Sequence, residues 1–231
     1  MSNDSSPVIL AVETATRAGS VGLSLADQLL ASVSGDPASS HSNDLIENIE
    51  AVLQQAGREL RDINVLAAAV GPGSFTGLRI GLATVKSLAV SLRINCAGVS
   101  TLAAVARTAG ESDQTVALLP AGRGEVFAQM FAVRDGEVRA LDAAVHLTPS
   151  ALLERYGAVS NLIWAGEGAH LQRELLQGSA NQGWKLAPHE PLAAAVGRLA
   201  FQEWLANRLV APGDLHANYL RASDAEINAN A

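Results

Sequence analysis

Residues Gly71 to Gly81 read GPGSFTGLRIG, and this stretch decides how the chain is expected to fold. Its first seven residues contain three glycines and one proline. They predict a tight loop, because glycine enters positive φ cheaply and proline fixes its own φ. The apolar run before the loop, residues 65–70, is typical of a strand buried on both faces. A helical pattern follows from Leu78 to about Leu92, so the stretch predicts a strand, a loop and a helix.

The helix after the loop has three distinguishable faces. An apolar stripe that must be buried consists of Leu78, Leu82, Val85, Ala89 and Leu92. A line of small side chains that would let another helix approach closely consists of Gly77, Gly81, Thr84, Ser87 and Ser91. A basic line consists of Arg79, Lys86 and Arg93. We therefore expect two neighbours for this helix. Either both belong to this chain or one is a partner protein.

Composition indicates a folded chain that does not bind nucleic acid unaided. With 231 residues, 48% of them hydrophobic and 17% charged, the chain can bury one large core or two small ones. The formal net charge of −7 opposes binding to a phosphate backbone, which depends on clustered Lys and Arg. A nucleic acid would have to be held by another protein.

Three features favour a cytoplasmic location. The single cysteine, Cys96, excludes an internal disulfide and fits a reducing compartment. Residues 1–7 are polar and lack the pattern of a signal sequence. No stretch approaches the roughly 20 uninterrupted apolar residues of a membrane span.

The order of the predicted elements repeats once along the chain. The first half has strands at 8–12, 20–25 and 29–33, a helix at 44–55, the glycine-loop unit, a strand near 95–99 and a helix at 102–108. Residues 109–114 are polar and form the best candidate linker. The second half has strands at 115–119, 126–133 and 138–145, a helix from Pro149, a strand at 162–165, and helices near 171–176 and at 193–209. This repetition predicts an internally duplicated α/β chain.

Two places could contact an anion, and each has a plain structural alternative. The loop is not a Walker loop, because Gly77 is followed by leucine and arginine instead of lysine and a hydroxyl residue. Backbone amides at a helix start can still hold an anion, which makes Gly73 and Ser74 candidates. Glu13 and Thr14 lie in a turn of the kind that approaches ATP in sugar kinases and actin-like ATPases. We favour a turn bonded to its own backbone, since Glu is longer than the usual Asp.

The spacing of histidines and nucleophiles predicts no catalytic or metal site. No two of the five histidines lie three or four residues apart, so a zinc-protease helix is absent. Ser74 does not stand in a Gly-x-Ser-x-Gly motif, and Cys96 lies in an apolar strand, where packing is a commoner role than reactivity.

Four segments, in chain order, resemble the TsaB family, which is also called YeaZ. They are residues 9–16 (ILAVETAT), the glycine loop 71–81, residues 98–102 (GVSTL) and residues 124–127 (GEVF). The likeness runs from Val8 to about Phe131 and returns at residues 219–221 (YLR). The glycine loop is highly specific to the family, whereas the other segments alone would be weak.

The resemblance implies a fold of two actin-like (ASKHA, ribonuclease H-like) subdomains. We expect an N-terminal subdomain at residues 1–109 that carries the glycine loop and the docking helix. A C-terminal subdomain would span residues 110–231, with its last helix and tail packing back on the first.

The resemblance also implies a non-catalytic role in tRNA modification. In the family, TsaB pairs with its paralogue TsaD and works with TsaE, after TsaC makes a threonylcarbamoyl adenylate. The product is N6-threonylcarbamoyladenosine beside the tRNA anticodon. We expect no cofactor of the chain's own and contact with tRNA through the complex only. The resemblance allows ATP or ADP at the joint with TsaD and a homodimer when the chain is alone, and the sequence does not decide either point.

The docking helix is expected to supply the partner interface. The interface residues that the resemblance implies are Phe75, Leu78, Arg79, Gly81, Leu82, Val85, Lys86 and Ala89. The sequence departs from the family at Pro120 and Gly122, which replace an Asp and an Arg, and at Glu13, which replaces the commoner Asp. The alternative functions are a small actin-like kinase or ATPase using Glu13 and the loop amides, and, ranked last, a peptidase.

Overall fold

In the computed structural model, which describes residues 6–38, 41–178 and 183–220, the chain divides into two units. The first unit consists of residues 1–101 and 191–217, and the second of residues 102–190 and 218–231. The sequence predicts a single boundary, at residue 109. The units divide earlier because α3 (Thr101–Thr108) packs within the second unit, where Val105 lies against Gly166.

The described part of the first unit contains a five-stranded mixed sheet in the order β3-β2-β1-β4-β5. Its strands are β1 (Val8–Glu13), β2 (Ser20–Leu25), β3 (Gln28–Ser34), β4 (Val65–Gly71) and β5 (Cys96–Ser100). Antiparallel pairing joins β1 to β2 and β2 to β3, whereas β1, β4 and β5 are parallel. Every residue of β1 is buried, because helices cover both faces of the sheet.

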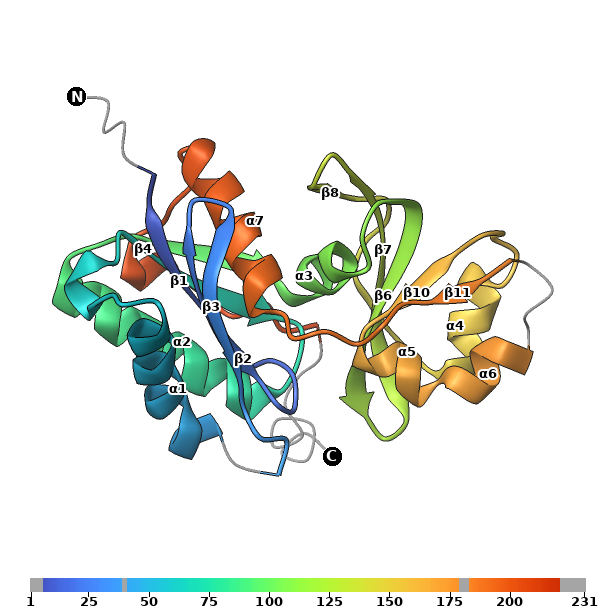
Figure 1. The fold of residues 1–231 in the computed structure, drawn as a ribbon. Coiled ribbons are helices and arrows are strands. Elements are labelled where there is room, and N and C mark those ends of the chain that lie inside the picture. The colour runs from blue at the N-terminus through green and yellow to red at the C-terminus, as the bar shows by residue number, and fades with distance from the viewer. Residues whose placement is uncertain (1–5, 39–40, 179–182, 221–231) are drawn as a thin grey trace. The chain divides into compact units, whose positions relative to one another are not determined.

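Successive side chains of a strand point to opposite faces, which assigns each helix to one side. Leu10 and Leu23 face the core formed with α1 (His41–Gln55) and α2 (Phe75–Leu92). On the other face, Gly22 and Ser24 approach α7 (Ala193–Leu205). Figure 1 shows α1 and α2 on one side of this sheet and α7 on the other.

The second unit repeats the strand order and directions of the first. Its strands are β6 (Ser112–Gly122), β7 (Glu125–Arg134), β8 (Glu137–Ala140), β9 (Val145–Leu147), β10 (Ile163–Ala165) and β11 (Lys185–Leu186). Read as β8-β7-β6-β10-β11, the sheet has the antiparallel and parallel pairs in the same places as β3-β2-β1-β4-β5, and β9 adds a further pair with β7. The core packs under α4 (Pro149–Tyr156), α5 (Glu167–Leu171) and α6 (Arg173–Gly178). The predicted duplication is confirmed.

Two predicted elements of the second unit are interrupted. The single strand expected at 138–145 is split into β8 and β9, because Asp142 Oδ1 accepts the Met130 N–H at 2.7 Å in place of a backbone partner. The helix expected near 171–176 is divided at Gln172, which ends α5 with a non-helical φ of −95° and ψ of 16° before α6 begins at Arg173.

The predicted end of the last helix is also wrong. Helix α7 stops at Leu205 instead of residue 209, since Asn207 adopts a left-handed φ of 54° that a helix cannot continue through. Two short 3₁₀ helices, Leu60–Asp62 and Pro212–Asp214, were not predicted.

The buried thiol of Cys96 gives a testable dependence of stability on pH. Burial raises its pKa from the ordinary 9.0 to about 11, opposed by a smaller effect of the positive charge on Lys86. The folded chain therefore holds this proton more tightly than the unfolded chain does. We expect the resulting stabilisation to be complete well below pH 9 and to decline by about 2 kcal/mol as the pH rises to 11.

Urea unfolding at several pH values between 8 and 11 measures this decline. The control is Cys96→Ala, which has no thiol to titrate, so its stability should approach that of the original chain as the pH rises. If the free energies of unfolding of the two proteins changed with pH in parallel, Cys96 would not be the group responsible for the decline.

Candidate partner-docking helix

The glycine loop joins the end of β4 to the start of α2. The Gly71 N–H donates to Thr101 Oγ1 at 3.1 Å, and a cis peptide bond links Gly71 to Pro72. Ser74 then caps the helix, because its Oγ accepts the Gly77 N–H at 3.2 Å. This cap explains why α2 begins at Phe75, three residues before the apolar pattern does.

The turn between β1 and β2 packs directly on the loop. The Ser74 N–H donates to the Ala15 carbonyl at 2.8 Å, and Thr14 Oγ1 donates to the Gly77 carbonyl at 2.8 Å. A Cβ on Gly73 would lie only 2.6 Å from the Ala15 Cβ. Glycine is thus required there by close approach of the turn.

The small residues at the start of α2 serve this same contact. Gly77 and Gly81 are both buried, and a Cβ on Gly81 would overlap Thr14 Oγ1. This end of the small-residue line therefore has its neighbour within the chain. It is not open to a partner helix.

Glu13 is buried in the same turn and is bonded to its own chain. Only 1% of Glu13 is exposed. Its Oε1 accepts the Thr16 N–H at 2.7 Å and its Oε2 accepts the Thr16 hydroxyl at 2.8 Å, with Ser20 Oγ at 3.5 Å. The four residues predicted for an anion contact, Glu13, Thr14, Gly73 and Ser74, lie together in the structure. The carboxylate of Glu13, the hydroxyls of Thr14 and Ser74 and the backbone N–H of Ser74 all hydrogen-bond to other groups of this chain. The sequence does not predict Thr16 and Ser20 as partners of Glu13: Thr16 belongs to the segment 9–16 without an assigned role, and Ser20 belongs to no motif.

Five of the residues expected at the partner interface face the core of this chain instead. They are Leu78, Gly81, Leu82, Val85 and Ala89. Leu82, Val85 and Ala89 belong to the cluster that joins α2 to α1 and the sheet. Their assignment to a surface is wrong, because the apolar stripe of α2 covers the chain's own sheet.

The opposite side of α2 is exposed and forms a continuous stripe, which we call the docking face. It consists of Thr76, Arg79, Ala83, Ser87 and Val90. Val90 is 67% exposed, and the Arg79 guanidinium lies 3.9 Å from the centre of the Phe75 ring. Lys86 is half-buried beside this stripe. The spacing of seven between Thr76, Ala83 and Val90 is a signal in the sequence that places these three residues on one side of the helix.

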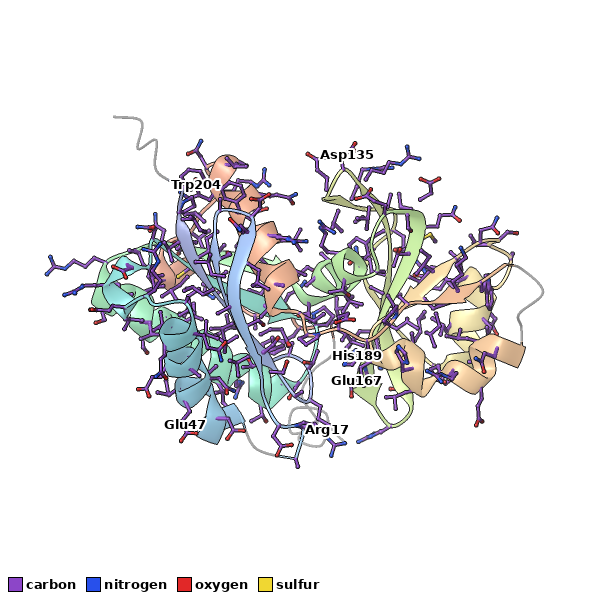
Figure 2. All side chains as sticks on the ribbon, in the orientation of Figure 1. Arg17, Glu47, Asp135, Glu167, His189 and Trp204 are labelled. Carbon is purple, nitrogen blue, oxygen red and sulfur yellow. The ribbon has the colours of Figure 1, made fainter. Side chains whose placement is uncertain are left out.

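Helix α1 packs against α2 and widens the exposed surface. It presents Ile46, which is 52% exposed, together with the exposed acids Glu47 and Glu50. Figure 2 shows Glu47 projecting from α1 away from the sheet. The surface of the two helices therefore combines acidic groups on α1 with Arg79 and a large apolar side chain on α2.

The described residues also bear on a membrane span and a metal site. Among the described residues, helix α2 is the one helix long and apolar enough to cross a membrane by length and composition; Leu82, Val85 and Ala89 on one of its sides lie in the core of the first unit. No three His, Cys, Asp or Glu side chains of the described ranges are grouped so that they could hold a metal ion.

Comparison with known proteins identifies sequence relatives. The family model described as "TsaD: tRNA N6-adenosine threonylcarbamoyltransferase" matches residues 35–227. The tRNA threonylcarbamoyladenosine biosynthesis protein TsaB of Escherichia coli is 37% identical over 122 residues, and the match covers 52% of each chain. The chain thus spans about half the length of this relative. TsaB of Bacillus subtilis is 24% identical over 226 residues, or 94% of this chain and 96% of that one.

Solved structures extend the likeness to the whole fold. YeaZ from Pseudomonas aeruginosa is 26% identical, with a TM-score of 0.79, over 93% of this chain and 100% of that one. The predicted α/β class with an actin-like fold is confirmed.

Proposed function

Because this chain belongs to the TsaB/YeaZ group of the family described by the TsaD model, we propose that it is a non-catalytic subunit of the tRNA threonylcarbamoyladenosine machinery. Its partner is TsaD, and the subunit supports transfer of the threonylcarbamoyl group to N6 of the adenosine beside the anticodon. The observation that carries the proposal is the docking face of α2, which is exposed on the side of the helix opposite the buried residues Leu78, Leu82 and Val85.

The composition of the docking face suits a helix of a related fold. Ala83 and Ser87 are small enough for a second helix to approach closely, and Val90 supplies an apolar contact. An exposed arginine is typical of interfaces, because its planar group both stacks and hydrogen-bonds. Since residues 35–227 match the TsaD model itself, a partner with the same fold could present its own equivalent of α2.

The absence of catalysis in this subunit is supported by the use of its polar groups. The side chains of Glu13, Thr14 and Ser74, which are the candidate anion contacts of the β1–β2 turn and the glycine loop, already hydrogen-bond to other groups of this chain. Cys96 is fully buried and its raised pKa disfavours the reactive thiolate.

The net charge of −7 supports a role in which other subunits hold the tRNA. We place the complex in the cytoplasm, with TsaE and TsaC acting beside TsaD. ATP or ADP would bind at the joint with TsaD and not to this chain alone. The same surface of α1 and α2 would allow self-association when TsaD is absent.

Reconstitution tests the proposal. Purified TsaD, TsaE, TsaC and unmodified tRNA are combined with and without this chain, and modified adenosine is measured by mass spectrometry. We expect omission of the chain to abolish modification. Modification at the full rate without it would rule the proposal out.

Calorimetry with MgATP on the isolated chain tests the kinase or ATPase alternative. We expect no binding at micromolar nucleotide. Saturable binding with turnover of ATP would favour the enzyme instead.

A further inference from the structure

We infer that the Glu13 carboxylate is a built-in ligand that fills an anion site in the β1–β2 turn, and that this site would take a small free carboxylate if Glu13 were shortened. The inference is independent of the proposed partner. It assigns to the turn a specific chemistry, recognition of one carboxylate group by donors of this chain.

The donors converge on the carboxylate from both ends of the turn. Thr16 contributes its backbone N–H to Oε1 and its hydroxyl to Oε2, at 2.7 and 2.8 Å. Ser20 Oγ lies 3.5 Å from Oε2, so it is a weaker contributor. A carboxylate bonded on both oxygens in this way is held by charge-assisted hydrogen bonds, which are stronger than neutral ones.

Ser20 also connects the carboxylate to the start of α7. The first residue of α7, Ala193, donates its N–H to Ser20 Oγ at 3.0 Å, and the residue before it provides no side-chain cap. The partial positive charge at the start of a helix favours an anion nearby. The hydroxyl of Ser20 therefore links the buried carboxylate in the turn to the first backbone N–H of α7.

Burial makes the site selective against a second anion. Glu13 is 1% exposed, and Thr16 and Ser20 are 8% and 3% exposed. A phosphate placed against this carboxylate would meet a like charge where water screens little, which costs far more than at a surface. The turn of this chain is thus closed to phosphate while Glu13 is in place.

The substitution Glu13→Ala creates a well-defined test. It removes Cγ, Cδ and both Oε atoms, which together have the size and charge of an acetate ion. The variant should unfold at a lower temperature than the original chain. Sodium acetate, compared with sodium chloride at equal ionic strength, should then raise its unfolding temperature in a saturable way, by about 3 °C at ten times the dissociation constant.

Three controls separate this site from general salt effects. The original chain should not respond to acetate, and Glu13→Gln should not either, because its amide still fills the space. Acetamide, which has the shape of acetate without its charge, should not rescue Glu13→Ala. If Glu13→Ala is unfolded in chloride, the readout becomes the folded fraction by circular dichroism, which should rise as acetate is added.

Several outcomes would overturn the inference. One is a Glu13→Ala variant, folded or unfolded, that acetate does not affect. Another is an equal response of the original chain or of Glu13→Gln to acetate. Binding of inorganic phosphate by the original chain that is lost in Glu13→Ala would also overturn it, because Glu13 would then recruit a ligand instead of replacing one.

Discussion

Val90→Glu is expected to weaken binding of this chain to TsaD by about a hundredfold without unfolding it. Val90 is 67% exposed on the docking face of α2, so a charge is accommodated in the free chain. In a dry interface the same carboxylate would lose its water without gaining a partner, at a cost on the order of 3 kcal/mol. Titration calorimetry or co-elution with purified TsaD measures the loss.

A matched control exists in the other unit. Leu171 is 66% exposed in α5, so Leu171→Glu makes nearly the same change at nearly the same exposure. It should bind TsaD normally. Equal binding by Val90→Glu and the original chain would refute docking through this face.

The buried side of α2 should behave differently. Leu82 is 7% exposed and lies in the core, so Leu82→Glu should unfold the first unit as well as abolish binding. Circular dichroism separates the two substitutions. A folded Leu82→Glu variant would show that α2 is less tightly packed than described.

Gly81→Ala is expected to destabilise the first unit by about 2 kcal/mol, although alanine is the better helix former. The new Cβ would overlap Thr14 Oγ1, which is fixed by its buried bond to the Gly77 carbonyl. The gain in helix propensity, about 1 kcal/mol, is smaller than the cost of moving the β1–β2 turn. Urea unfolding measures the difference.

A double-mutant cycle with Thr14→Ala identifies the cause. Removing the hydroxyl relieves the overlap, so the double variant should be more stable than the sum of the single effects predicts, by about 1 kcal/mol or more. Gly213→Ala is the control, because a Cβ there meets nothing within 4 Å. Additive effects of Gly81→Ala and Thr14→Ala would place the strain elsewhere.

Local pattern was sufficient to predict most of the fold. The glycine loop with its flanking strand and helix, the strand at residues 20–25 and the repeated order of elements are all present as expected. These features depend on residues close together in the sequence, whose spacing determines which side chains share a face. The strands of the second unit are harder to predict where a side chain takes the place of a backbone hydrogen-bond acceptor, as the Asp142 carboxylate does beside β7.

The faces of α2 could not be assigned to neighbours from the sequence. Its apolar stripe indicates burial but does not say which surface buries it. The contact between Thr14 and Gly77 joins residues 63 positions apart, and no local signal reports such a pair. The family resemblance implies that α2 docks with a partner, but it does not say which side of the helix is exposed.

The return of α7 to the first unit has a consequence for synthesis of the protein on the ribosome. Residues 102–190 form their own sheet and are contiguous, whereas the first sheet is uncovered on one face until residue 205 has been made. The first unit therefore begins to be translated first but is completed last. One face of its sheet stays uncovered while about a hundred further codons are translated. Protease challenge of nascent chains stalled beyond residues 190 and 217, with a spacer filling the exit tunnel, should find residues 1–101 cleavable in the shorter and resistant in the longer. Equal resistance at both lengths would show that the face does not need α7.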